Sequence, residues 1–104
     1  MHNLSSKDRK KNRASQLING FAARMSLPHD VKLMARDVIN QIFDSEEMQG
    51  KSLTNLVATI LYISAKLCKK PRPLKELCAT MCVKRKEVQE YFFILSMSLI
   101  PPPF

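Results

Sequence analysis

The three cysteines and two histidines are the side chains with which this chain could bind zinc or form a covalent bond to a substrate. Cys78 and Cys82 are four positions apart, a spacing that places two thiolates on one face of a helix. A structural zinc site needs four ligands, and Cys68 is the one cysteine that remains. His2 and His29 are far apart in the sequence, in neither metal-ligand nor proton-relay spacing. We therefore expect free thiols that pack as small apolar groups in a reducing compartment.

Carboxylates and hydroxyls form no catalytic grouping either. Asp44, Glu46 and Glu47 cluster at the end of a predicted helix, where acids more often stay solvated or meet a basic partner than transfer protons. The chain has two glycines and no phosphate-binding glycine loop. Because no nucleophile is paired with a base, we predict that the protein is not an enzyme.

Basic side chains are the more informative group. The chain has 17 Lys and Arg against 9 acids, a net charge of +8, and its pI is about 9.7. Residues 66–86 hold eight of these bases and one acid, whereas residues 28–50 carry a net charge of −3. Such segregation favours directed contact with a polyanion or an acidic protein over simple solubility. The candidate binding residues in this segment are Lys69, Lys70, Arg72, Lys75, Lys84, Arg85 and Lys86.

The elements that position these side chains are predicted to be helices. A length of 104 residues with 45% apolar content suits one small globular domain. The most apolar stretch, residues 56–65, is half the length that spans a bilayer. Two glycines and six prolines divide the chain into helix-sized pieces, and no segment alternates apolar and polar residues as a strand would. An all-α domain without a membrane span is therefore predicted.

Apolar residues at helical spacing predict five helices. The first three cover about 14–25, 28–42 and 53–68, and the third is apolar on nearly every face, so the others should surround it. The last two cover 74–81 and 88–99, with the short connection of a helix-turn-helix. The second helix of such a motif presents its N-terminal residues to nucleic acid. Lys84, Arg85 and Lys86 occupy that position.

Both ends of the chain differ from this helical part. Residues 1–13 carry a net charge of +4 and almost no apolar side chain, which predicts a flexible basic arm. Residues 101–104 are three prolines and a phenylalanine, which predicts an extended tail. The folded domain is therefore expected over residues 14–100.

Aromatic side chains could stack on nucleic-acid bases. Tyr62, Tyr91 and Phe92 fall on apolar helical faces, however, and we expect them in the core. Phe93 falls off the apolar stripe of its helix and is expected to contribute to an exposed apolar patch.

Several short pieces of sequence between Ser5 and Leu99 point to a family. They are Ser5-Ser6-x-Asp8-Arg9, Ala23-Arg24-x-x-Leu27-Pro28, Gly50-Lys51, Leu61-Tyr62-Ile63, Lys75-Glu76-Leu77-Cys78-Ala79 and Lys86-Glu87-Val88. In this order and spacing the chain resembles the first cyclin-like repeat of transcription factor IIB. The first of these pieces favours the first repeat over the second. The related polymerase III factor is an alternative.

The resemblance implies a five-helix cyclin fold in a general transcription initiation factor. Such a factor binds the complex of TATA-binding protein with promoter DNA and helps recruit RNA polymerase II in the nucleus. The family's loop before the third helix reaches DNA downstream of the TATA box, which implies this role for Gly50 and Lys51. The basic pair at the start of the family's last helix implies contacts with nucleic acid or partner proteins for Arg85 and Lys86. Farther along that helix, Glu90 interrupts the family's basic face.

The same fold also serves cyclin-like protein-interaction modules, so a kinase or another acidic partner is the alternative to nucleic acid. A basic helix-turn-helix favours nucleic acid, because a kinase-binding surface would not need one. A complete family member also has a zinc ribbon and a second repeat, which these 104 residues do not contain. We therefore expect no cofactor, a monomer, and weak, salt-sensitive affinity for DNA alone.

Overall fold

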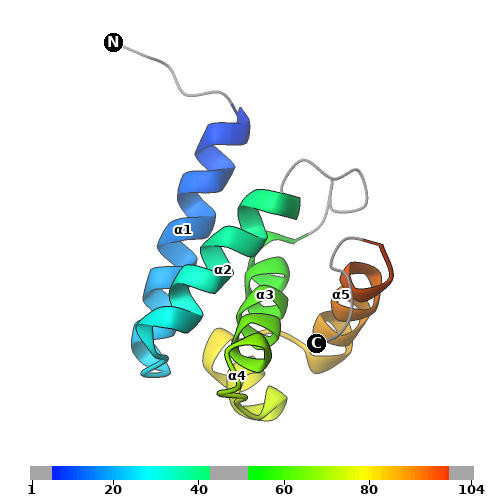
Figure 1. Cartoon of the computed structure of the whole chain (residues 1–104). Coiled ribbons are helices and arrows are strands. Elements are labelled where there is room, and N and C mark those ends of the chain that lie inside the picture. Colours follow the sequence, from blue (N-terminus) through cyan, green and yellow to red (C-terminus); the bar gives the residue numbers. More distant parts are fainter. Residues whose placement is uncertain (1–5, 43–51, 99–104) are drawn as a thin grey trace.

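The computed structural model describes residues 6–42 and 52–98, which form five helices and no strand (Figure 1). These helices are α1 (Ser6–Arg24), α2 (His29–Ile42), α3 (Leu53–Leu67), α4 (Leu74–Met81) and α5 (Arg85–Ser98). The predicted all-α, five-helix architecture is therefore confirmed. None of the helices in the described ranges is both long and apolar enough to cross a membrane.

Helix α3 is the centre of the fold and contacts each of the other four helices. Ten of its 15 residues are buried, because apolar side chains occupy nearly every face of the helix. Leu61 and Val57 are completely buried. The side chains that α1, α2, α4 and α5 turn inward complete a continuous core around it. The predicted central position of this helix is confirmed.

The N-terminus of α3 is tied to α5 by polar contacts. Ser52 caps the helix, because its hydroxyl oxygen accepts a hydrogen bond from the Asn55 amide at 3.4 Å. The backbone N–H of Ser52 donates to the Tyr91 hydroxyl at 2.8 Å. The Asn55 side-chain amide donates to the Glu87 carboxylate at 2.6 Å. These bonds fix the start of α3 against the first two turns of α5.

Helix α1 begins at Ser6, about two turns earlier than its apolar spacing predicts. Residues 6–13, which we expected to be part of a flexible arm, are therefore helical. Lysine and arginine form helices readily, but the apolar pattern reveals only the part of a helix that packs on its neighbours. Figure 1 shows the N-terminal turns of α1 extending beyond the end of α2.

Three helices end at a residue with left-handed backbone that is not glycine: Ser26 (φ 52°), Lys69 (φ 59°) and Cys82 (φ 55°). The amide that follows each of them donates to the carbonyl five residues back. The bonds are Leu27 N to Ala22 O at 2.9 Å, Lys70 N to Ala65 O at 2.8 Å and Val83 N to Cys78 O at 3.1 Å. This is the Schellman ending, which usually uses glycine because a Cβ disfavours the left-handed region.

Candidate nucleic-acid interface

Helices α4 and α5 form the predicted helix-turn-helix, with residues 82–84 between them. Leu77 of α4 and Val88 of α5 are fully buried in the shared core and hold the two helices together. Cys82 reverses the chain at the end of α4 with its left-handed backbone. The Lys84 carbonyl then accepts bonds from the Glu87 and Val88 amides at 3.1 and 3.2 Å, which starts α5.

The N-terminal end of α5 carries three exposed cations, Lys84, Arg85 and Lys86. None of the three side chains has a hydrogen bond or ion pair with another residue in the described ranges. The free backbone N–H groups of a helix N-terminus also carry partial positive charge, so the cations and the helix end repel one another. A phosphate bound there would relieve this repulsion, because backbone N–H groups and ammonium or guanidinium groups all donate to its oxygens.

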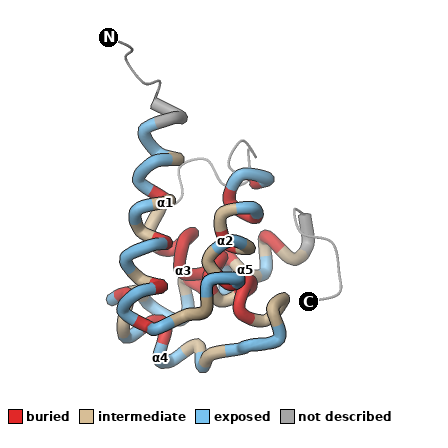
Figure 2. The backbone as a smooth tube through the Cα atoms, turned by 60° about the vertical axis from the view of Figure 1, so that its left-hand side comes forward, coloured by how far each residue is buried: buried red, intermediate tan, exposed pale blue. Residues whose placement is uncertain are grey.

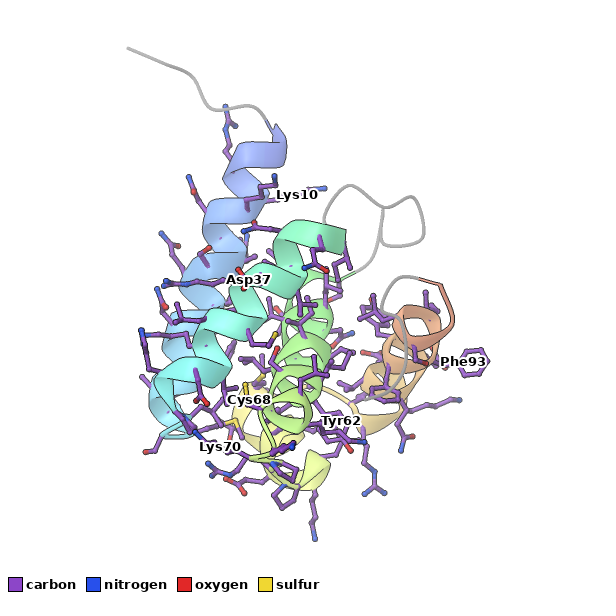
Figure 3. The ribbon with its side chains drawn as sticks, in the orientation of Figure 1. Lys10, Asp37, Tyr62, Cys68, Lys70 and Phe93 are labelled. Atoms are coloured by element: carbon purple, nitrogen blue, oxygen red, sulfur yellow. The ribbon has the colours of Figure 1, made fainter. Side chains whose placement is uncertain are left out.

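Lys70 and Arg72, which we predicted as binding residues, take part in contacts within the fold. The Lys70 ammonium lies 2.8 Å from the Asp30 carboxylate at the start of α2 (Figure 3). This hydrogen bond lowers the pKa of the Asp30 carboxyl below its usual value. The Arg72 guanidinium donates to the Met25 carbonyl at 2.9 Å and pairs with Glu76. Lys70 therefore fastens the linker after α3 to the start of α2, and Arg72 fastens it to the connection between α1 and α2.

Two other predicted residues remain open to solvent. Lys69 lies in the turn that follows α3, Lys75 lies on α4, and both side chains are exposed. Neither pairs with an acid among the residues that the structure describes. Gly50 and Lys51 lie outside the described residues. The described part of the chain thus leaves five of the nine candidates exposed and unpaired, namely Lys69, Lys75, Lys84, Arg85 and Lys86.

A small pocket between α3, the start of α4 and α5 was not predicted. It has a volume of about 220 Å³ and is lined by Tyr62, Lys66, Leu74, Val88, Gln89 and Phe92. The Tyr62 and Phe92 rings meet edge to face with centroids 5.8 Å apart, and the Lys66 ammonium lies 5.4 and 5.5 Å from their centroids. Tyr91 is buried, as expected, whereas Tyr62 and Phe92 are only half-buried. This volume is below that of a typical small-molecule site.

The cysteines have three different environments, and all three thiols are free. Burial raises the pKa of Cys78 and of Cys68, and the charge of Arg85 partly opposes this rise at Cys78. The expectation that the cysteines pack in the core is wrong for Cys82, which is exposed at the end of α4. No group of three or more His, Cys, Asp or Glu within the described ranges could hold a metal ion.

We expect these environments to set the order of thiol reactivity. Cys82 should react first with a maleimide in a short labelling pulse, Cys68 more slowly, and Cys78 only when the protein opens, because exposed thiolate is the reactive species. Mass spectrometry of the digested protein measures each site separately. In denaturant the three should react at similar rates. Early labelling of Cys78 in the folded protein would contradict this packing.

Similarity to known proteins identifies the family to which this helix-turn-helix belongs. The family described as "Transcription factor TFIIB repeat" matches residues 7–97, which run from the first turn of α1 into the last turn of α5. The chain belongs to the TFIIB family. The resemblance found in the sequence is thereby confirmed.

Individual relatives agree with this assignment. "Transcription initiation factor IIB" of Xenopus laevis is 26% identical over 96 residues, which cover 92% of this chain and 30% of the relative. The protein of the same name from Drosophila melanogaster is 30% identical over 89 residues, 86% of this chain and 28% of the relative. "Transcription initiation factor IIB 1" of Thermoplasma volcanium is 28% identical over 92 residues, 88% of this chain and 30% of the relative. The TFIIB-family chain thus spans less than a third of the length of these relatives.

Proposed function

We propose that this TFIIB repeat acts in transcription initiation by binding promoter DNA that TATA-binding protein already holds. The observation that carries the proposal is the trio Lys84, Arg85 and Lys86, which are exposed at the N-terminus of α5 and pair with no acid among the residues that the structure describes. In the isolated domain the three cations repel one another and the positive end of the helix dipole. A phosphate backbone converts that repulsion into attraction.

The contacts of this interface are with phosphates. Lys84, Arg85 and Lys86 bind one stretch of phosphate backbone. Lys75 on α4 and Lys69 at the end of α3 add positive charge near them. Phosphate contacts position a protein on DNA without reading its sequence. Gly50 and Lys51 supply a further contact. The bond between Ser52 and Tyr91 supports this arrangement, because it holds the residue that follows Lys51 in the sequence against α5.

The names of the relatives state a role in transcription initiation, and the resemblance to transcription factor IIB supplies the proposed partners. TATA-binding protein presents the DNA, RNA polymerase II is recruited to the assembled complex, and the domain works in the nucleus. Its role is binding rather than catalysis. These assignments extend to a chain that spans about 30% of its relatives, so each is tested separately.

A gel-shift experiment tests the proposal. A TATA-containing duplex is incubated with and without TATA-binding protein, and the 104-residue chain is added at two salt concentrations. We expect a supershift of the preformed complex and weak, salt-sensitive binding to free DNA. No shift by a domain shown to be folded by circular dichroism would refute the proposal.

A second candidate function is a protein-interaction module for an acidic partner. It is favoured by Phe93, which is 64% exposed and points away from the helices (Figure 3), since exposed aromatic side chains are enriched at protein interfaces. A folded domain that shifts no DNA but binds acidic peptides would support this function instead.

Replacing Lys69 by glycine should separate stability from binding. Glycine adopts a left-handed backbone without the Cβ penalty, so Lys69→Gly should raise the free energy of unfolding by about 0.5–1 kcal/mol. The same change removes one cation and should reduce the salt dependence of DNA binding, log K against log salt, by about 0.9. Thermal melts and binding titrations measure the two effects.

Ser26→Gly is the matched control for this change. Ser26 holds the equivalent left-handed position at the end of α1 and carries no charge. The Ser26→Gly variant should be more stable than the parent and should bind DNA with the same affinity. A Lys69→Gly variant that binds DNA as tightly as the parent removes Lys69 from the interface.

A further inference from the structure

The outward face of α1 carries a basic stripe along nearly the whole helix. Arg9, Arg13, Gln16, Gly20 and Arg24 are all exposed. At 3.6 residues per turn these five positions lie within an arc of about 80°. The buried residues of α1, which include Ala14 and Ile18, lie on the opposite side. Figure 2 shows the exposed positions of α1 recurring along the length of the helix. We call this face the α1 stripe.

The charge on the α1 stripe has one sign. Neither aspartate nor glutamate occurs between Arg9 and His29, and the one acid in the sequence of α1 is Asp8, directly before Arg9. Arg24 lies over the Phe21 ring, 5.4 Å from its centroid, and Arg9 and Arg13 pair with no acid of the described chain. A solvated helix face commonly alternates charges of both signs. A face that carries only positive charge is complementary to a polyanion.

Gly20 is the second observation. Glycine is among the least favourable residues in a helix interior, and it persists where a backbone must be approached closely. A Cβ added at Gly20 would meet nothing within 4 Å, so no neighbour in the described fold requires glycine there. The absence of a side chain at this position, between Arg13 and Arg24, would let the backbone of a partner come close to the helix.

We propose that the α1 stripe is a second phosphate-binding surface, which lies along the backbone of duplex DNA. Arg9 to Arg24 span about 22 Å of helix, which is long enough to meet several successive phosphates of one strand. The arginines bind phosphate oxygens with their forked guanidinium groups. Gln16 donates from its amide, and Gly20 admits the strand.

The α1 stripe is separate from the N-terminal end of α5. Helices α1 and α5 both pack on α3, and they lie on either side of it in Figures 1 and 2. The two surfaces therefore contact different stretches of nucleic acid, and their contributions to binding should add. This inference rests on the proposed function in one respect, since it takes duplex DNA as the partner.

The test measures binding of the 104-residue chain to a fluorescent duplex of unrelated sequence over a range of salt concentrations. Arg9→Gln/Arg13→Gln should reduce the salt slope by about 1.8 and the affinity at low salt by at least roughly tenfold. Arg85→Gln/Lys86→Gln should reduce both independently, and the four-site variant should show the sum. Lys32→Gln removes one charge from α2 outside both surfaces and is the control for net charge.

Gly20→Leu probes the close approach. Leucine favours the helix and has open space at this position, so the melting temperature should hold or rise while DNA affinity falls severalfold. A structural role alone would not combine these two changes. Unaltered affinity in Gly20→Leu would remove Gly20 from the contact and overturn the close approach.

The outcomes separate this inference from the proposed function. If the α5 variant weakens binding and Arg9→Gln/Arg13→Gln weakens it no more than Lys32→Gln, the α1 stripe is a solvated face and the inference fails alone. If only the α1 variant weakens binding, the α1 stripe stands and the α5 interface fails. If the parent chain binds no free duplex at any salt concentration, the inference fails, and the supershift with TATA-binding protein still decides the proposed function.

Discussion

Replacing Arg85 and Lys86 by glutamate should abolish entry of the domain into the promoter complex at moderate salt. The two side chains are exposed, and loss of two phosphate contacts lowers the salt slope by about 1.8. Charge reversal adds repulsion, so the affinity for the complex of TATA-binding protein with DNA should fall about 100-fold or more. The gel-shift titration with TATA-binding protein measures this loss.

The folded state should not suffer from this change. Acids at a helix N-terminus interact favourably with the macrodipole, by about 0.3–1 kcal/mol each. The double variant should therefore melt at the same temperature as the parent or above it, which distinguishes lost binding from lost structure. The single variants Arg85→Glu and Lys32→Glu change the net charge equally, and we expect Lys32→Glu to reduce the affinity for DNA only slightly. Equal losses of affinity in these two variants would attribute the effect to net charge rather than to the end of α5.

The helices that carry this interface were predictable because they are amphipathic or fully apolar. The run of apolar residues in α3 identified the central helix, and the helical spacing of apolar residues in α4 and α5 identified the helix-turn-helix. The ends of α1 and α3 were predictable from Pro28 and Pro71, since proline cannot continue a helix. The left-handed residues themselves were not predictable, because serine, lysine and cysteine give no local signal for that backbone.

The site was predictable in composition and less so in arrangement. A charge count recognises that residues 66–86 are basic, but it cannot show which cations meet acids that are distant in sequence. Lys70 pairs with Asp30, 40 positions away, and Arg72 reaches the Met25 carbonyl, 47 positions away. Only the fold separates these fastening contacts from the open cations at the start of α5. The basic N-terminal turns of α1 were missed for a related reason, since a helix that projects from the core has no apolar stripe.

Leu61→Ala should produce the largest loss of stability. Leu61 is fully buried in α3, and α3 contacts all four other helices, so no single neighbour can move in to fill the space. Leucine-to-alanine changes at such sites cost about 2–5 kcal/mol, against a total of about 5–15 kcal/mol for a domain of this size. The melting temperature should fall by roughly 8–40 °C, at about 4–8 °C for each kcal/mol.

Leu33→Ala is the matched control for this prediction, because Leu33 lies on α2 and is 45% exposed. The same substitution there should change the free energy of unfolding by no more than about 0.5 kcal/mol. Thermal and denaturant unfolding of the two variants gives the comparison, and similar losses from both would contradict the central position of α3. Because α1 and α5 both pack on α3, the Leu61→Ala variant should also lose DNA binding at temperatures where it begins to unfold. Leu33→Ala should still bind DNA at those temperatures. This difference would show that both basic surfaces depend on α3 for their position.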